Sequence, residues 1–577
     1  MSISRRAFIV SLCATTALAT GFAATRAQAA ARRPNIITII LDDVGYSDLG
    51  CFGAEIRTPA MDALAGAGLR YAHFHTKAVC SSTRAALLTG RNSHSVNMPD
   101  VPDVVQIMKN DPALADMFDI PSNAQNLAQA LKRRGYATWA VGKWHLTPMK
   151  ELGANAGRTS WPRQRGFDYF YGFARGWTDQ YQPDLVENDQ YIKPELPEGY
   201  HLSVDLTDRA LALIERHQAA PEAGPFYLNL AYGTAHAPIQ VSRDFSAPYD
   251  AIYEKGWDAV RESRFERMKA MGIVPPETVL PTRAGTDRAW ADLDADEKAV
   301  FTRYMAVYAG FIEHCDRQIG RLIDGLKRGG LYDDTIIVLL SDNGAAGEAG
   351  QEGEFDGLYR RNTLTPAQQR ARIEELGTGK TQAEYPRPWA MVGSTPFRRY
   401  KLWPYSGGTR TPMIFSWPRE VRDPGAIRRQ FVDVIDVAPT LLDAAGAAFD
   451  AQVDGVKQLP IAGRSFLATV RDGRVEGRHT QYFELRGNRA ITDGQWRAVA
   501  MQACGQDHAA DRWELYDLAS DFSESTDVAS RHPTELQRLK ALWQSEWASF
   551  VTTPLGAPLA FVCERPAMFD LAPAAKR

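Results

Sequence analysis

The stretch PNIITIILDD (residues 34–43) decides the fold class of this chain. It is a continuous run of apolar and mostly β-branched residues, bounded by Pro34 and Gly45, and it ends in two carboxylates. Such a run is typical of a strand that is buried on both faces, as in a parallel sheet covered by helices. A second run of the same kind, TIIVLLSDNG (335–344), ends in Asp342 and Asn343.

Strands and helices are expected to alternate through the rest of the first 450 residues. Further strands are predicted at LRYAHFHT (69–76), ATWAVGKWH (137–145), PFYLNLAYG (225–233) and PMIFSW (412–417). Helices are predicted at TPAMDALAGAG (58–68), with Thr58 as cap and Pro59 in the first turn, at SNAQNLAQALKRRG (122–135), and at 296–327, whose apolar stripe includes Cys315. This alternation predicts an α/β fold with a large, mixed, mostly parallel sheet flanked by helices.

The organisation changes near residue 450. The segments TQYFELRG (480–487), NRAITDG (488–494) and QWRAVAM (495–501) predict an antiparallel sheet, and PTELQRLKALWQSEWASF (533–550) predicts an amphipathic helix that closes it. We therefore expect a catalytic domain over 30–449 and a smaller C-terminal α+β domain over 450–577. The charged segment 345–394 has weak periodicity and is expected to be an insertion that rims a functional site.

The first residues predict export. SRRAFIVSLCATTALATGFAATRAQAA (4–30) holds the pair Arg5 and Arg6, an apolar stretch, and the small-residue site Ala27-Gln28-Ala29. This pattern predicts a twin-arginine signal peptide over 1–29, recognition by the twin-arginine translocase, and a periplasmic location. The alternative is an N-terminal membrane anchor, although the run is short and alanine-rich for a spanning helix. No other run of about 18 apolar residues occurs, so no stable membrane insertion is expected.

Composition and cysteine count limit the remaining possibilities. The 577 residues have a formal net charge of −3, which argues against nucleic acid or an anionic membrane as the main partner. Of six cysteines, Cys13 lies in the signal and an odd number remains. Cys80 is our candidate for an unpaired thiol, Cys315 for an inert core residue, and Cys504 and Cys563 for a disulfide. Cys51 is expected in a loop near the site.

Polar residues stand where two of the predicted strands end. Asp42 and Asp43 end one strand, and Asp342 and Asn343 end another. In an open α/β sheet ligands bind beyond the carboxyl ends of strands, so these groups are expected to meet there. Three carboxylates together repel one another without a cation, and an all-oxygen set suits Ca²⁺ or Mg²⁺ better than Zn²⁺. The alternative is that each pair is an ordinary turn after a strand.

Cationic and imidazole side chains also gather where loops begin. Each alone is typical of a solvated loop residue or a satisfied histidine, but together with a metal they indicate an oxyacid ester as substrate. They are Arg84, Lys143, His145, His236 and Lys401. Several aromatic residues are candidates either for an aromatic-accepting pocket or for the core. They are Trp139, Trp144, Trp177, Tyr181 and Trp403.

Several sequence motifs resemble those of a known family. CSSTRAALLTGR (80–91) resembles the sulfatase signature Cys-x-Pro-Ser/Thr-Arg-x-x-x-Leu-Thr-Gly-Arg, with Ser82 in place of the usual proline. Other blocks follow in the family's order over almost the whole chain, and the nearest type is the bacterial arylsulfatases of the alkaline-phosphatase-like superfamily. They are IILDDVGYSDLGCFG (39–53), GYATWAVGKWHL (135–146), LAYGTAHAPIQ (230–240), VLLSDNGA (338–345), FRRYKLWPYSGGTRTP (397–412), DVIDVAPTLLDAAG (433–446) and WELYDLASD (513–521).

The resemblance implies hydrolysis of sulfate esters, with aryl sulfates as the expected class. It implies that a formylglycine-generating enzyme oxidises Cys80 to Cα-formylglycine, whose hydrate is the nucleophile and forms a sulfated hemiacetal intermediate. It also implies one Ca²⁺ per chain, held with the side chain at position 80 by Asp42, Asp43, Asp342 and Asn343.

The resemblance further implies a role for each remaining site residue. Arg84 holds the modified side chain, Lys143 and Lys401 bind the sulfate, and Asp342 assists the attack as a base. His236 binds the sulfate and donates a proton to the leaving oxygen, and His145 accepts the proton of the second hydroxyl.

Three alternatives remain open on the sequence. A phosphonate monoester or phosphodiester hydrolase of the same superfamily uses the same nucleophile. An alkaline-phosphatase-like phosphomonoesterase requires a serine or threonine nucleophile and a two-metal site with several histidines. A non-catalytic anion-binding protein would result if Cys80 stays a thiol.

Overall fold

The computed structural model describes residues 33–107, 117–153, 155–357, 363–551, 555–556 and 560–565. The predicted export signal therefore lies outside the described residues. The architecture is dominated by one ten-stranded sheet with the strand order β11-β2-β10-β9-β1-β8-β4-β5-β6-β7. Among the described helices, none is both long and apolar enough to cross a membrane.

The centre of the sheet is parallel, as the buried apolar runs predicted. Strand β1 (Asn35–Leu41) lies between β8 (Phe226–Ala231) and β9 (Thr335–Ser341), and β4 (Ala137–Lys143) and β5 (Tyr169–Phe173) extend the parallel part beyond β8. In the register, Leu41 is opposite Ser341 and Ile40 is opposite Ala231. The strands β9, β1, β8 and β4 therefore end at the same edge of the sheet.

Both sides of the sheet contain antiparallel pairs, although β11 pairs with β2 in parallel, so the sheet is mixed. On one side β10 (Met413–Ser416) runs antiparallel to β9 and is followed by β2 (Leu69–Tyr71) and β11 (Ile427–Arg428). On the other side lie the short strands β6 (Val186–Glu187) and β7 (Gln190–Tyr191).

The single strand predicted over 69–76 is in fact two strands. A turn at Ala72 and His73 separates β2 from β3 (Phe74–His75), which pairs with β12 (Val432–Asp433) in a separate two-stranded sheet. The turn is held in place because the N–H of Ala72 donates to the carbonyl oxygen of Arg428.

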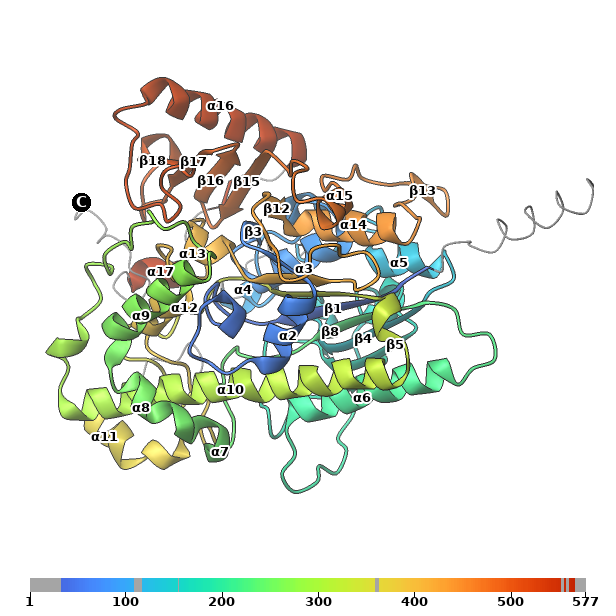
Figure 1. Cartoon of the computed structure of the whole chain (residues 1–577), viewed down its shortest axis with the longest axis horizontal. Helices are drawn as coiled ribbons and strands as arrows, with labels where there is room; N and C mark the ends of the chain where they lie inside the picture. Colours follow the sequence, from blue (N-terminus) through green and yellow to red (C-terminus); the bar gives the residue numbers. More distant parts are fainter. Residues whose placement is uncertain are drawn as a thin grey trace, which may run out of the picture.

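Helices cover both faces of the sheet (Figure 1). The long α10 (Ala295–Arg328) and α6 (Leu202–Gln218) lie on one face, and α3 (Cys80–Thr89), α5 (Leu127–Lys132) and α14 (Val437–Ala444) lie on the other. Helix α10 begins at a capping box formed by Asp294 and Glu297. Cys315 is completely buried on its apolar side, as predicted.

Thr58 is the N-cap residue of α2 (Pro59–Ala67) and Pro59 lies in its first turn, as predicted, but the side chain of Thr58 does not cap the helix. The Thr58 hydroxyl makes no cap hydrogen bond; it donates to Oδ1 of Asp62 at 2.9 Å. The free N–H groups of Ala60 and Met61 donate instead to the carboxylate of Asp316 on α10, at 3.0 and 2.8 Å. A carboxylate from a packed neighbour has therefore replaced the local hydroxyl, which satisfies the same orphan donors.

The C-terminal part contains the predicted antiparallel meander. Strands β15 (Thr480–Leu485), β16 (Asn488–Asp493), β17 (Trp496–Ala500) and β18 (Trp513–Asp517) follow one another in the sheet, and α16 (Pro533–Phe550) lies across it (Figure 1). This unit has its own apolar cluster, which includes Ile491, Leu515 and Trp543. The domain boundary at 449/450 stays a prediction.

The predicted disulfide is confirmed. Cys504 and Cys563 are bonded, with their Cα atoms 5.6 Å apart, and the bond joins the connection between β17 and β18 to α17 (Ala560–Glu564). The remaining helices and strands are short or lie in connections. They are α4 (Val104–Ile107), α7 (Arg243–Ser246), α8 (Asp250–Tyr253), α9 (Gly256–Ala270), α11 (Pro366–Ala371), α12 (Arg387–Gly393), α13 (Ser406–Thr409), α15 (Leu467–Arg471), β13 (Gln452–Val453) and β14 (Val456–Lys457).

Candidate active site

The parallel strands deliver the predicted polar residues to one edge of the sheet. Asp42 and Asp43 follow β1, Asp342 follows β9, Lys143 is the last residue of β4, and His236 lies in the loop after β8. Because β9, β1, β8 and β4 are adjacent and parallel, these residues converge at the carboxyl ends of the strands, where ligands bind in such sheets.

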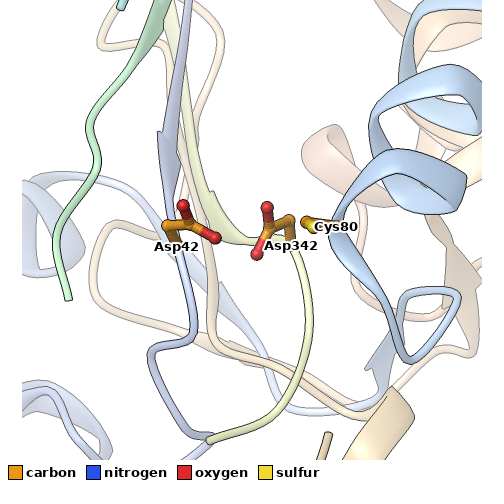
Figure 2. Close-up of side chains that lie close together, drawn as sticks. All are labelled: Asp42, Cys80 and Asp342. Atoms are coloured by element: carbon orange, nitrogen blue, oxygen red, sulfur yellow. The ribbon is translucent and has the colours of Figure 1, made fainter. Parts of the chain in front are cut away.

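Cys80 meets the carboxylates of this edge from the opposite side. Figure 2 shows the side chains of Asp42 and Asp342 turned toward each other, with Cys80 beside them at the start of α3. One ligand atom from each of the three lies within 4.8 Å of the others, and all three residues are buried. Burial raises the pKa of the Cys80 thiol to about 12, although Lys143 opposes the shift. The unmodified sulfur is therefore a thiol at neutral pH, which is a weak nucleophile.

Each of the three carboxylates has a cationic partner. Nζ of Lys143 donates to Oδ2 of Asp42 at 2.7 Å. Arg84 donates from Nε and Nη2 to Oδ2 of Asp342, at 2.9 and 2.7 Å. Nζ of Lys401 donates to Oδ2 of Asp43 at 3.0 Å. The site is therefore a buried array of alternating positive and negative charges. The residues predicted to bind sulfate or metal either form these ion pairs or lie next to them.

The surroundings shift the pKa values of the two neighbouring aspartates in opposite directions. Burial raises the pKa of Asp42 to about 7 despite the Lys143 ammonium, and the carboxylates of Asp342 and Asp43 add to the shift. Burial would also raise the pKa of Asp43, but the Lys401 ammonium and His236 lower it to about 2.

The oxygen atoms left without a hydrogen bond fit a hard cation. Oδ1 of Asp42 and Oδ1 of Asn343 are buried and accept no hydrogen bond. The amide of Asn343 uses its Nδ2 to donate to Oδ1 of Asp43 at 2.6 Å, which leaves its oxygen available. Buried oxygens beside several carboxylates are the ligand set that Ca²⁺ and Mg²⁺ prefer. The residues present therefore fit the predicted metal.

His145 connects Cys80 to a residue that the sequence did not indicate. Its Nδ1 lies 3.3 Å from Sγ of Cys80, and its Nε2 lies 2.6 Å from Oδ2 of Asp103. Asp103 belongs to a loop with no periodic pattern, and the only hint was that this loop follows the signature helix closely in sequence. Lys401 has a second unpredicted partner, because its Nζ lies 2.7 Å from Oε2 of Glu348.

His236 is held differently from His145. Its Nδ1 lies 2.6 Å from the carbonyl oxygen of Ala237, so Nδ1 carries the hydrogen, and its Nε2 lies 3.7 Å from Oδ2 of Asp43. Burial lowers the pKa of His236 to about 4, with Asp43 opposing the shift and Lys401 adding to it. Nε2 is thus the nitrogen directed to the charged centre.

The charged insertion over 345–394 reaches the site at its start. Glu348, which pairs with Lys401, is its fourth residue. Farther along, Glu384 is buried, and burial together with Glu348 and Glu354 raises the pKa of Glu384 well above its usual range. The insertion therefore adds acidic side chains behind Lys401.

Most of the candidate aromatic residues are in the core. Trp139 stacks on Phe226 with ring centroids 5.2 Å apart. The indole N–H of Trp144 donates to the carbonyl oxygen of Ser160, and Trp403 is buried. Trp177 and Tyr181 are half-buried, so these two retain surface that a ligand can contact.

Comparisons with known proteins agree with this geometry. The family model described as Sulfatase matches residues 34–447, and the model described as N-sulphoglucosamine sulphohydrolase, C-terminal, matches residues 399–545. An uncharacterized sulfatase of Schizosaccharomyces pombe is 30% identical over 569 residues, covering 94% of this chain and 98% of its own. The arylsulfatase of Klebsiella aerogenes is 30% identical over 467 residues, covering 79% of this chain and 95% of its own.

Solved structures share the fold at lower identity. The protein Ps i-CgsB, crystallised with k-i-k-neocarrahexaose, aligns with a TM-score of 0.63 at 22% identity, covering 93% of this chain and 98% of its own. The phosphonate monoester hydrolase of Agrobacterium radiobacter aligns with a TM-score of 0.54 at 17% identity, covering 90% and 96%. The family match, which spans more than half of the chain, and the convergence of Cys80 with the aspartates lead to one conclusion: this chain belongs to the sulfatase family and is a sulfuric ester hydrolase.

Proposed function

We propose that the chain hydrolyses aryl sulfates to a phenol and sulfate through Cα-formylglycine formed from Cys80. The observation that carries this proposal is the position of Cys80, which starts α3, lies within 4.8 Å of ligand atoms of Asp42 and Asp342, and faces Nδ1 of His145 at 3.3 Å. The arylsulfatase of Klebsiella aerogenes, aligned over 95% of its length, supports the aryl class. The hydrated aldehyde supplies two hydroxyl groups on one carbon, so that one can attack sulfur and the other can lose its proton as sulfate departs.

A Ca²⁺ ion is proposed at the same edge of the sheet. Asp42, Asp43, Asp342 and Asn343 would hold it together with the side chain at position 80. When bound, the ion would stabilise the negative charge that develops on the sulfate oxygens. Elemental analysis of the purified protein should give one calcium per chain, and Asp43→Ala should lower metal content and activity together. Stoichiometric zinc, or two metals per site, would contradict the proposal.

The chain's own residues supply the remaining functions. The ammonium groups of Lys143 and Lys401 are buried beside the aspartates and can neutralise a sulfate that enters between them. Arg84 makes both of its hydrogen bonds to Asp342 through Oδ2, and Oδ1, which accepts the N–H of Asp43 at 3.4 Å, is the oxygen proposed to assist as a base. His236 directs Nε2 to this centre and is the proposed proton donor to the leaving oxygen. His145 is the proposed acceptor of the second hydroxyl proton.

Mass spectrometry of the peptide that contains residue 80 tests the proposal directly. After denaturation and alkylation, an aldehyde should replace the thiol at position 80, whereas Cys315 should still be alkylated and serves as the internal control. Cys80→Ser should abolish turnover of a nitrophenyl sulfate. An active enzyme whose Cys80 is a fully alkylatable thiol would overturn the proposal. Ser82, whose hydroxyl is buried without a hydrogen-bond partner, stands at the usual proline position of the motif.

Paired assays separate the remaining alternatives. A phosphonate monoester or phosphodiester hydrolase would turn over the phosphorus esters faster than the matching sulfate, and a protein that only binds anions would turn over neither. A phosphomonoesterase with two metals is not favoured. Both ring nitrogens of His145 face Cys80 and Asp103, and Nδ1 of His236 faces Ala237, so of these two histidines only Nε2 of His236 is directed to the centre, whereas a two-metal site needs several histidine ligands.

We also propose export to the periplasm by the twin-arginine translocase. The disulfide between Cys504 and Cys563 supports an oxidising compartment, because such bonds are rare in the cytosol. Arg5→Lys with Arg6→Lys should keep the protein in the cytoplasmic fraction, and unchanged periplasmic activity would contradict this route.

A further inference from the structure

Asp103 reaches His145 from a loop that the rest of the protein anchors. The loop follows the signature helix, and Asp103 directly precedes the short α4. Three residues earlier, Oδ1 and Oδ2 of Asp100 accept hydrogen bonds from Arg486 at 3.1 and 2.7 Å, which ties the loop to the C-terminal meander. Asp103 itself keeps a partly exposed carboxylate, with 31% of its side chain accessible, and places Oδ2 2.6 Å from Nε2 of His145.

The backbone of His145 is fixed independently of this contact. Its N–H donates to the carbonyl oxygen of Ala174 at 3.1 Å, and its carbonyl accepts the hydroxyl of Ser81 at 2.8 Å. Its φ of 54° lies in the left-handed region. Since Ser81 directly follows Cys80, the same contacts hold His145 beside the reacting position.

The imidazole ring of His145 is also confined at its edge. Gly176 packs so closely that a Cβ there would lie 2.7 Å from Cε1 and 2.8 Å from Nε2 of His145. The orientation of the ring is therefore fixed. What the packing leaves open is the tautomer, that is, which ring nitrogen carries the hydrogen. A neutral imidazole donates from one nitrogen and accepts at the other.

We propose that Asp103 is a positioning residue for sulfate release: by accepting Nε2–H of His145, it keeps the lone pair of Nδ1 directed at residue 80. This inference rests on the proposed formylglycine chemistry. Without Asp103, a neutral His145 could carry its hydrogen on Nδ1, and that nitrogen could then accept no proton.

The proposed step balances with this tautomer. The O–H bond of the second hydroxyl breaks, and its proton moves to Nδ1 of His145. The electron pair of that bond forms the C=O bond, while the carbon–oxygen bond to sulfate breaks and its pair leaves with the sulfate. The resulting imidazolium donates from both nitrogens, and the carboxylate of Asp103 stabilises it as carboxylates do in hydrolase triads.

The test compares Asp103→Asn with Asp103→Glu and with Gln106→Ala as the control, because Gln106 is an exposed residue of the same segment. With a nitrophenyl sulfate, Asp103→Asn should keep the first rapid release of nitrophenol and lose about 10²-fold in kcat, within the range of about 10² to 10⁴-fold for acid–base catalysis. KM should fall with kcat, since only the second step is slowed. Protein quenched during turnover should be heavier than its hydrated aldehyde form by the mass of one SO₃ group. Asp103→Glu should recover part of kcat, and Gln106→Ala should resemble the wild type.

A readout independent of turnover reports the tautomer itself. In ¹⁵N-histidine-labelled protein, with the signals assigned by their loss in His145→Gln, Nδ1 should show the shift of an unprotonated nitrogen and Nε2 that of a protonated one. Asp103→Asn should move both signals toward the opposite tautomer.

The outcomes separate this inference from the proposed function. If Asp103→Asn has wild-type kcat and unchanged ¹⁵N signals while residue 80 of the wild type is formylglycine, the inference fails and the proposed function stands. If Asp103→Asn lowers kcat without SO₃ accumulation and without a tautomer change, Asp103 has only a structural role. If the active wild type retains a thiol at residue 80, the proposed function has failed first.

Discussion

Gly176 lies against the edge of the His145 ring, and replacing it by alanine tests how closely catalysis depends on that ring. The new Cβ would stand 2.7 Å from Cε1, whereas ordinary contact begins at 3.4 Å, so the ring must move by about 0.7 Å. The movement is directed away from residue 176 and disturbs the contacts of both ring nitrogens, with Cys80 at 3.3 Å and Asp103 at 2.6 Å.

The size of the expected effect follows from that displacement. A misplacement of about 1 Å can lower a rate by about 10²-fold, so a shift of about 0.7 Å should lower kcat by about 10- to 10²-fold. Stability should fall by about 1 to 3 kcal/mol, the usual effect of overpacking, and the fold should persist.

The assay is steady-state hydrolysis of a nitrophenyl sulfate by Gly176→Ala, with Gly157→Ala as control. A Cβ at Gly157 would meet nothing within 4 Å, so that variant should match the wild type. Because His145 is assigned to the second step, kcat and KM should fall together while kcat/KM changes little. A wild-type kcat in Gly176→Ala, with the ring unmoved in its crystal structure, would refute the reasoning.

Three further expectations concern stability and proton transfer. Arg264→Met should lower the free energy of unfolding by about 3 to 5 kcal/mol, because it removes the cation that the buried carboxylates of Asp48 and Glu55 share. The half-exposed Arg267 also pairs with Glu55, and Arg267→Met should lower the free energy of unfolding by less than about 1 kcal/mol in the same urea titration. His236→Ala should slow phenyl or alkyl sulfates far more than nitrophenyl sulfate, because a good leaving group needs no proton; equal slopes in a leaving-group series would make His236 only a binding residue. Cys504→Ser opens a bond across 59 residues and should lower stability by up to about 4 kcal/mol, measured by thermal unfolding, and an unchanged midpoint would show that the bond has no stabilising role.

The central sheet could be predicted because its signal is local. Residues 36–41 are apolar at every position except Thr38, and that pattern is typical of strands covered on both faces. The residues at the strand ends could be predicted for the same reason, since parallel strands end at a common edge. The pairing of Leu41 with Ser341, which places Asp42 beside Asp342, depends on a strand order that the sequence did not indicate.

The features that escaped prediction depend on contacts between distant segments. Asp103 reaches His145 only because its loop is held by Arg486, 386 residues beyond Asp100. Thr58 has the local pattern of a cap, but Asp316 from α10 takes that position because the packed helix brings a full negative charge to the same N–H groups. The split between β2 and β3 depends in the same way on β11 and β12, which follow more than 350 residues later.

The two histidines of the site show how one residue type can be given opposite tasks. His145 faces a carboxylate through Nε2. Burial lowers the pKa of His145, but the carboxylate of Asp103 favours the charged form of the ring and opposes that shift, so this partner supports the uptake of a proton. His236 faces a neutral carbonyl through Nδ1, which carries the hydrogen of the neutral ring, so Nε2 can donate only after the ring has taken up a second proton. Burial and the nearby Lys401 ammonium lower the pKa of His236 to about 4, so that second proton is held weakly. A group that binds its proton weakly gives it up readily to a developing phenolate, and a group beside a carboxylate gains one readily from a hydroxyl. The hydrogen-bond partners, rather than the histidines themselves, therefore support the assignment of His236 as the acid of the first step and His145 as the base of the second.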